Sequence, residues 1–158
     1  MLPISKILCP TDFSEPSFGA LDAAVELAGH FKSRLYLVHV VAEVPRPGWA
    51  TPFYPAPETY AMELQDYEQA MRRNAERKLH EVAERHRVNP VIVDTAIGQG
   101  DAATEIVRIA DTERVDLIVI ATHGLTGWRH LVYGSVTEKV LRLAHCPVLT
   151  IRSAKGRD

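Results

Sequence analysis

Cysteine is scarce in this sequence, and its scarcity limits the possible classes of protein. Among 158 residues only Cys9 and Cys146 occur, with neither a CxxC pair nor a spacing typical of metal ligands. A disulfide scaffold is therefore excluded, and no metal site is predicted. Both thiols lie in or beside apolar segments, so we interpret them as small core residues in a reducing compartment.

A strong charge of one sign and a long apolar run are also missing. The formal net charge is -2, which lacks the basic excess that drives binding to phosphate backbones, so we expect no nucleic acid partner. The longest uninterrupted apolar run, 117–121, is far below the roughly 20 residues that cross a bilayer. The first residues show no signal-peptide pattern. We expect a cytoplasmic protein without membrane association.

The sequence does contain a strict alternation of short apolar segments and amphipathic segments. Strands are predicted at 6–9, 34–41, 91–93, 117–121 and 147–151. Helices are predicted to begin after Ser14, near Glu58, after Asp101 and at Ser135. Such alternation predicts an α/β fold, an open doubly wound five-stranded parallel sheet with helices on both faces. We expect a single domain over 1–158 with a proline-rich loop at 42–57.

The segment between the fourth strand and the last helix is the most informative for function. Gly124, Gly127 and Gly134 precede a helix that Ser135 opens, and ligands of open α/β sheets bind beyond the carboxyl ends of the strands. Glycines admit close approach of an anion, which the amides of the following helix attract. Two interpretations stay open: a phosphate site, or glycines that permit positive φ beside an ordinary helix cap.

Five separated segments of the sequence form a recognisable set: 7–14 (ILCPTDFS), 37–40 (LVHV), 116–124 (DLIVIATHG), 134–140 (GSVTEKV) and 145–149 (HCPVL). Together, in this order and spacing, they resemble the universal stress protein family. ATP-binding members of that family share a pattern of glycine, two residues, glycine, nine residues, then glycine and a small hydroxyl residue. Gly124, Gly134 and Ser135 match its later positions, whereas Ala121 stands where the first glycine is expected.

This resemblance implies an adenine-nucleotide alpha-hydrolase-like fold with strand order 3-2-1-4-5, ATP as the ligand and a homodimer. Asp12 would hold the ribose hydroxyls, Pro10 and Thr11 would line the same turn, and Val40 would meet the adenine edge with its backbone. Phosphates would contact Gly124, Gly134, Ser135, Val136 and Thr137, with the Ala121 methyl group beside them. Any Mg²⁺ would arrive with the phosphates. The dimer would form through the C-terminal strand at 147–152.

Other functions are weighed against a dimeric nucleotide-binding regulator of the stress response. Residues 98–103 fit GxGxxA after a strand, a dinucleotide pattern, but follow the third strand, and Asp101 would repel a pyrophosphate. A helix-capping loop is the alternative. His39, His123 and His130 belong to no catalytic motif, so no catalytic residue is assigned. A weak ATPase using Asp12, or an interaction protein with an empty pocket and the aromatic loop of Trp49, remain alternatives.

Overall fold

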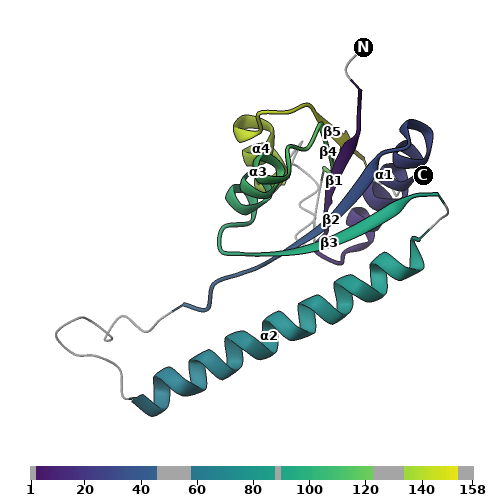
Figure 1. Cartoon of the computed structure of the whole chain (residues 1–158). Helices are drawn as coiled ribbons and strands as arrows, with labels where there is room; N and C mark the ends of the chain where they lie inside the picture. Colours follow the sequence, from purple (N-terminus) through teal and green to yellow (C-terminus); the bar gives the residue numbers. More distant parts are fainter. Residues whose placement is uncertain (1–2, 46–57, 88–89, 123–133, 153–158) are drawn as a thin grey trace, which may run out of the picture.

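The structure, a computed structural model, describes residues 3–45, 58–87, 90–122 and 134–152. Strands and helices alternate along the chain (Figure 1). Their order is β1 (Lys6–Pro10), α1 (Glu15–Phe31), β2 (Arg34–Val41), α2 (Glu58–Arg85), β3 (Ile92–Gln99), α3 (Ala102–Glu113), β4 (Leu117–Ala121), α4 (Ser135–Leu143) and β5 (Val148–Ile151).

The strands form one five-stranded sheet in the order β3-β2-β1-β4-β5, and every pairing is parallel. This confirms the predicted fold class and strand order. The order reverses between β1 and β4, because the chain first adds strands on one side of β1 and then on the other. A ligand site is expected at such a switch point.

Two helix starts have the side-chain caps that the sequence predicts. The Ser14 hydroxyl accepts a hydrogen bond from the Ser17 amide at the start of α1. At the start of α3 the Asp101 carboxylate accepts one from the Thr104 amide at 3.0 Å. Each cap satisfies an amide that has no intrahelical partner. The second cap supports the helix-capping interpretation of residues 98–103.

Apolar side chains on the two faces of the sheet form two core clusters, because successive strand residues point to opposite faces. Ile7 and Cys9 belong to the cluster beneath α1 and α2, and Leu8 belongs to the cluster beneath α3 and α4. Burial raises the pKa of the Cys9 thiol to about 12, with Asp22 adding to the effect. Cys9 is therefore the inert core residue that its sequence context predicts.

The third strand is longer than the sequence predicts. We expected a strand at 91–93 and a loop over 96–100, but β3 extends to Gln99 because it pairs with β2 along all of Arg34–Val41. Gly98 allows this close pairing: a Cβ atom there would lie 3.2 Å from Val40 Cγ2 and from Glu105 Cβ. Gly98 therefore allows the strand to continue at a position where a loop was predicted.

The helix α2 covers the sheet only with its C-terminal half, and its N-terminal half extends past the sheet (Figure 1). Its buried residues are Ala75, Leu79, Val82 and Ala83. The helical spacing also predicted Tyr67 on the packed face, but 57% of Tyr67 is exposed. The spacing gave the correct helix, whereas the length of the sheet determines how much of its apolar face is covered.

Leu143 was predicted on the inner face of α4, but it is 38% exposed. The buried residues of this helix are Thr137 and Val140.

Residues 46–57 of the proline-rich loop, with Trp49, lie outside the described residues. No helix in the described part of the chain is long and apolar enough to cross a membrane.

Candidate functional site

A cavity of about 300 Å³ lies at the carboxyl ends of β1, β2 and β4, beside the switch point of the sheet. It reaches the lower limit of the range typical of small-molecule sites. The helices α3 and α4, which cover the same face of the sheet, contribute to the cavity through their N-terminal residues. Its described lining consists of Pro10, Thr11, Asp12, Ser17, Val38, His39, Val40, Ala102, Ile106, Ile120, Ala121, Gly134, Ser135, Val136 and Thr137.

The sequence-predicted site residues meet at this cavity, with one exception that the structure does not describe. Those in the lining are Pro10, Thr11, Asp12, Val40, Ala121, Gly134, Ser135, Val136 and Thr137. Gly124 lies outside the described residues, as do Gly127, His123 and His130. The fold therefore brings together residues more than a hundred positions apart, which is what a common binding role requires.

The turn after β1 is held by its own polar side chains. The Thr11 amide donates to the Val38 carbonyl at 2.8 Å, and the Phe13 amide donates to Thr11 Oγ1 at 3.0 Å. The Asp12 carboxylate accepts hydrogen bonds from the Ser14 amide, at 3.0 Å, and from the Ser14 hydroxyl. These bonds fix the position of the Asp12 carboxylate at the cavity.

Phe13 adopts a left-handed backbone conformation with φ of 63°, which is unusual for a bulky residue. Its ring packs on the His39 ring with centroids 4.4 Å apart, and Lys78 Nζ lies 5.9 Å from its centroid. His39 Nδ1 lies 2.8 Å from the Thr11 carbonyl oxygen. Because a carbonyl only accepts, Nδ1 is the donor. The strained turn is thus fixed against β2.

The start of α4 is tied to the end of β4 by two hydrogen bonds. The Gly134 amide donates to the Thr122 carbonyl at 2.7 Å, and the buried Thr137 hydroxyl donates to the Ala121 carbonyl, also at 2.7 Å. The Thr137 hydroxyl is thus bonded to a backbone carbonyl in this structure, and its contact with a phosphate stays a prediction. Thr137 positions the helix start beside Ala121.

Backbone amides at the start of α4 are the polar groups best placed to receive an anion. Gly134 is the N-cap residue and makes no side-chain cap bond. The amides of the first helical turn have no acceptor within their own helix, and the helix dipole adds positive potential there. Val136, predicted on the inner face, is 38% exposed and lines the cavity. The turn thus offers donors and an apolar contact together.

Sequence reasoning missed part of the lining, namely Ser17, Val38, Ala102, Ile106 and Ile120, and it noted His39 without assigning it to a site. Ile106 and Ile120 carry the pattern of ordinary core residues, so no local signal separates them. Ser17 does have a signal, because it lies three positions after the helix cap Ser14. Its hydroxyl lies 2.9 Å from Thr11 Oγ1 and supports the turn.

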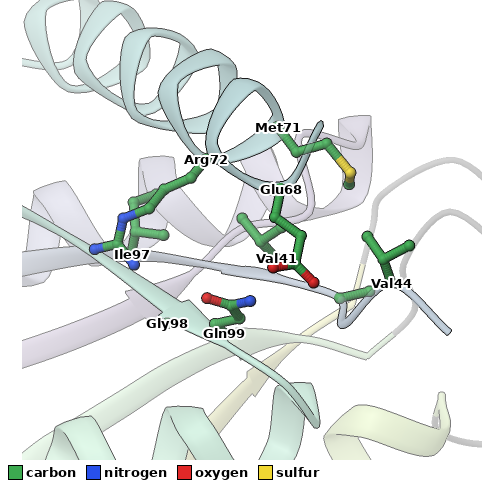
Figure 2. Close-up of a pocket in the computed structure, with 9 residues that line it drawn as sticks. Val41, Val44, Glu68, Met71, Arg72, Ile97, Gly98 and Gln99 are labelled. Atoms are coloured by element: carbon green, nitrogen blue, oxygen red, sulfur yellow. The ribbon is translucent and has the colours of Figure 1, made fainter. Parts of the chain in front are cut away.

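A second, smaller hollow lies between α2 and the ends of β2 and β3. Figure 2 shows Met71 and Arg72 of α2 across from Val41 and Gln99. Its volume of about 10 Å³ is close to that of a single water probe. It is too small for an organic ligand. Within the described ranges no group of three or more His, Cys, Asp or Glu could hold a metal ion.

The fold and the cavity define an open parallel α/β protein with a ligand-sized cavity at the switch point of its sheet. Within that class the chain belongs to the universal stress protein family, whose sequence profile matches residues 3–152. Universal stress protein MJ0531 of Methanocaldococcus jannaschii is 33% identical over 95% of this chain and 83% of its own. The solved structure of MJ0577, from the same organism, has a TM-score of 0.77 at 27% identity, covering 98% of this chain and all of the other.

Two more distant solved universal stress proteins are complexes with nucleotides. One is a complex with cAMP, with a TM-score of 0.59 at 21% identity, covering 97% of this chain and 100% of the other. The second, from Archaeoglobus fulgidus, is a complex with dAMP, with a TM-score of 0.53 at 19% identity, covering 96% and 99%. At these identities the likeness is one of fold.

Proposed function

We propose that this protein binds an adenine nucleotide, ATP, in the cavity at the end of β1 and β4, and acts in the cytoplasm as a homodimeric regulator of the stress response. The observation that carries the proposal is the convergence on one cavity of Asp12, Val40 and the start of α4 at Gly134. These are the positions to which the family pattern assigns ribose, adenine and phosphate.

Each part of the nucleotide has a chemically suitable partner in this cavity. The apolar groups of Val38, Val40 and Ile106 suit the adenine ring, and the Asp12 carboxylate suits two ribose hydroxyls as an acceptor. The amides of Ser135 and the next residue suit phosphate oxygens, as at other helix N-termini. Mg²⁺ would come with the phosphates. The complexes of the related proteins with cAMP and dAMP support an adenine ligand.

The homodimer is proposed from the edge of β5 that pairs with no other described strand. This strand ends the sheet order and pairs with β4 on its other side. Leu149 of β5 is 39% exposed, and Leu141 of α4 is also 39% exposed. An open apolar edge favours pairing with another strand. Antiparallel pairing of two β5 strands about a two-fold axis would cover both edges with identical contacts.

The proposal is tested by thermal unfolding of the full chain in a titration with ATP and Mg²⁺. At a hundredfold excess over Kd, binding stabilises the folded state by about 2.7 kcal/mol, which raises Tm by roughly 5 to 10 °C. GTP is the matched control, and we expect a smaller shift because its base has different edge groups. An unchanged Tm at millimolar ATP would contradict nucleotide binding, and equal shifts would contradict adenine recognition.

A further inference from the structure

An ion pair joins the N-cap of α3 to the middle of α4, the two helices whose N-terminal residues line the cavity. Lys139 Nζ on α4 lies 2.7 Å from Asp101 Oδ1, the N-cap carboxylate of α3. The side chains are 38% and 56% exposed, so both groups can be reached by solvent and by ligands. Asp101 directly precedes Ala102, which lines the cavity. The pair therefore lies at the rim of the proposed nucleotide site.

The direction of the Lys139 side chain places its charge near the proposed phosphate position. Lys139 follows Ser135 by four residues, so the two share one face of α4. Helical side chains tilt toward the N-terminus of their helix, which carries the Lys139 ammonium over the turn that begins at Ser135. The contact with Asp101 places the ammonium at the N-terminal end of the neighbouring helix α3.

Asp101 keeps its structural role without Lys139. Its Oδ1 atom also accepts hydrogen bonds from the Thr104 amide at 3.0 Å and from the Thr104 hydroxyl at 2.6 Å. The ammonium of Lys139 and the bonds from Thr104 hold the pKa of Asp101 well below its ordinary value, so the carboxylate is charged at neutral pH. Loss of Lys139 would leave the α3 cap intact, and the lysine is free to change partners.

The charge of the cavity gives a reason for such a change. The described lining contains the Asp12 carboxylate and neither lysine nor arginine. A polyphosphate would bring several negative charges to a site whose described lining already holds a carboxylate. Lysine is a flexible point charge that suits phosphate. Lys139 is a cation that the structure holds beside Ala102 of the lining through its ion pair with Asp101.

We infer that Lys139 is a specificity-determining residue that leaves Asp101 to bind the phosphates of the nucleotide, so that the pair selects polyphosphates over uncharged nucleosides. This inference rests on the proposed nucleotide binding. Asp101 competes with the ligand for the lysine, and it repels the phosphates once the lysine has moved. The two residues therefore act on ATP affinity in opposite directions.

Calorimetric titration with ATP and Mg²⁺, and separately with adenosine, tests the inference. Lys139→Gln should weaken ATP binding about three- to tenfold, the range for one partly exposed charge, and leave adenosine binding unchanged. Asp101→Asn keeps an acceptor for Thr104 and should strengthen ATP binding about two- to fivefold. Lys139→Arg should restore most of the affinity. Arg77→Gln removes an exposed ion pair with Glu81 on α2 and serves as the matched control.

The outcomes separate this inference from the proposed function. Equal effects of Lys139→Gln on ATP and adenosine, or no effect on either, would show that the pair only joins two helices. A loss of ATP affinity in Asp101→Asn would contradict the competition. The Lys139→Gln effect should also shrink at about 1 M salt, where charges are screened within about 3 Å. If the unmodified chain binds neither ligand, both proposals fail; if it binds both, only the role of Lys139 is in question.

Discussion

Asp12→Asn is expected to weaken ATP binding about 10- to 100-fold, the largest effect of a single substitution at the cavity. The proposed role of Asp12 is to accept hydrogen bonds from the ribose hydroxyls. A hydrogen bond to a charged group contributes about 1.5 to 3 kcal/mol. Asparagine keeps one oxygen for the Ser14 amide, so the turn should remain folded while the charge and one acceptor are lost.

A double-mutant cycle with a modified ligand makes this prediction specific. 2′,3′-Dideoxy-ATP lacks both ribose hydroxyls, so the unmodified chain should bind it more weakly than ATP by a similar factor. Asp12→Asn should then have little further effect on that ligand, because the coupled groups are already gone. Asp66→Asn on exposed α2 is the matched control. If Asp12→Asn weakens both ligands equally, Asp12 does not contact the ribose.

Thr150→Pro is expected to convert the proposed dimer into a folded monomer. The carbonyl of Pro147, directly before β5, and that of Ile151, at its end, accept hydrogen bonds from the amides of Ile118 and Thr122 on the β4 side. Because backbone groups alternate along a strand, the amide of Thr150 points to the free edge. Proline is tolerated at such an edge position, where it removes an outward donor and adds bulk. A β5–β5 interface would lose that bond twice.

Sedimentation or light scattering measures the result against a chain mass of 17.6 kDa. The unmodified chain should show twice that mass, and Thr150→Pro should raise the dimer Kd at least about tenfold. Thr150→Val is the control, because it keeps the amide and should remain dimeric. A monomeric unmodified chain would contradict the dimer, and a Thr150→Pro chain that stays dimeric would place the interface elsewhere.

The order of the elements and most of the cavity could be predicted because the signals are local or belong to the family pattern. Ser14 and Asp101 signal helix starts through their own side chains, and both caps are present. The positions of Pro10 and Gly134 at the cavity follow from the carboxyl-end rule for parallel sheets. These features need no knowledge of distant packing.

Other features depend on partners that no local pattern reveals. The extension of β3 to Gln99 depends on pairing with β2, and the exposure of Tyr67 depends on where the sheet ends beneath α2. The bond from the Thr137 hydroxyl to the Ala121 carbonyl joins residues 16 positions apart, so no local pattern predicts it. The ion pair between Asp101 and Lys139 likewise joins residues from different helices.

The most direct test of nucleotide binding in this cavity is a crystal structure of the full chain grown with ATP and Mg²⁺. We expect the adenine beside Val40, the ribose hydroxyls within hydrogen-bond distance of Asp12, and the phosphates on the first-turn amides of α4 after Gly134. Lys139 should then have left Asp101 for a phosphate oxygen. An empty cavity at saturating ATP, or a nucleotide bound away from Asp12 and α4, would contradict the proposed binding site.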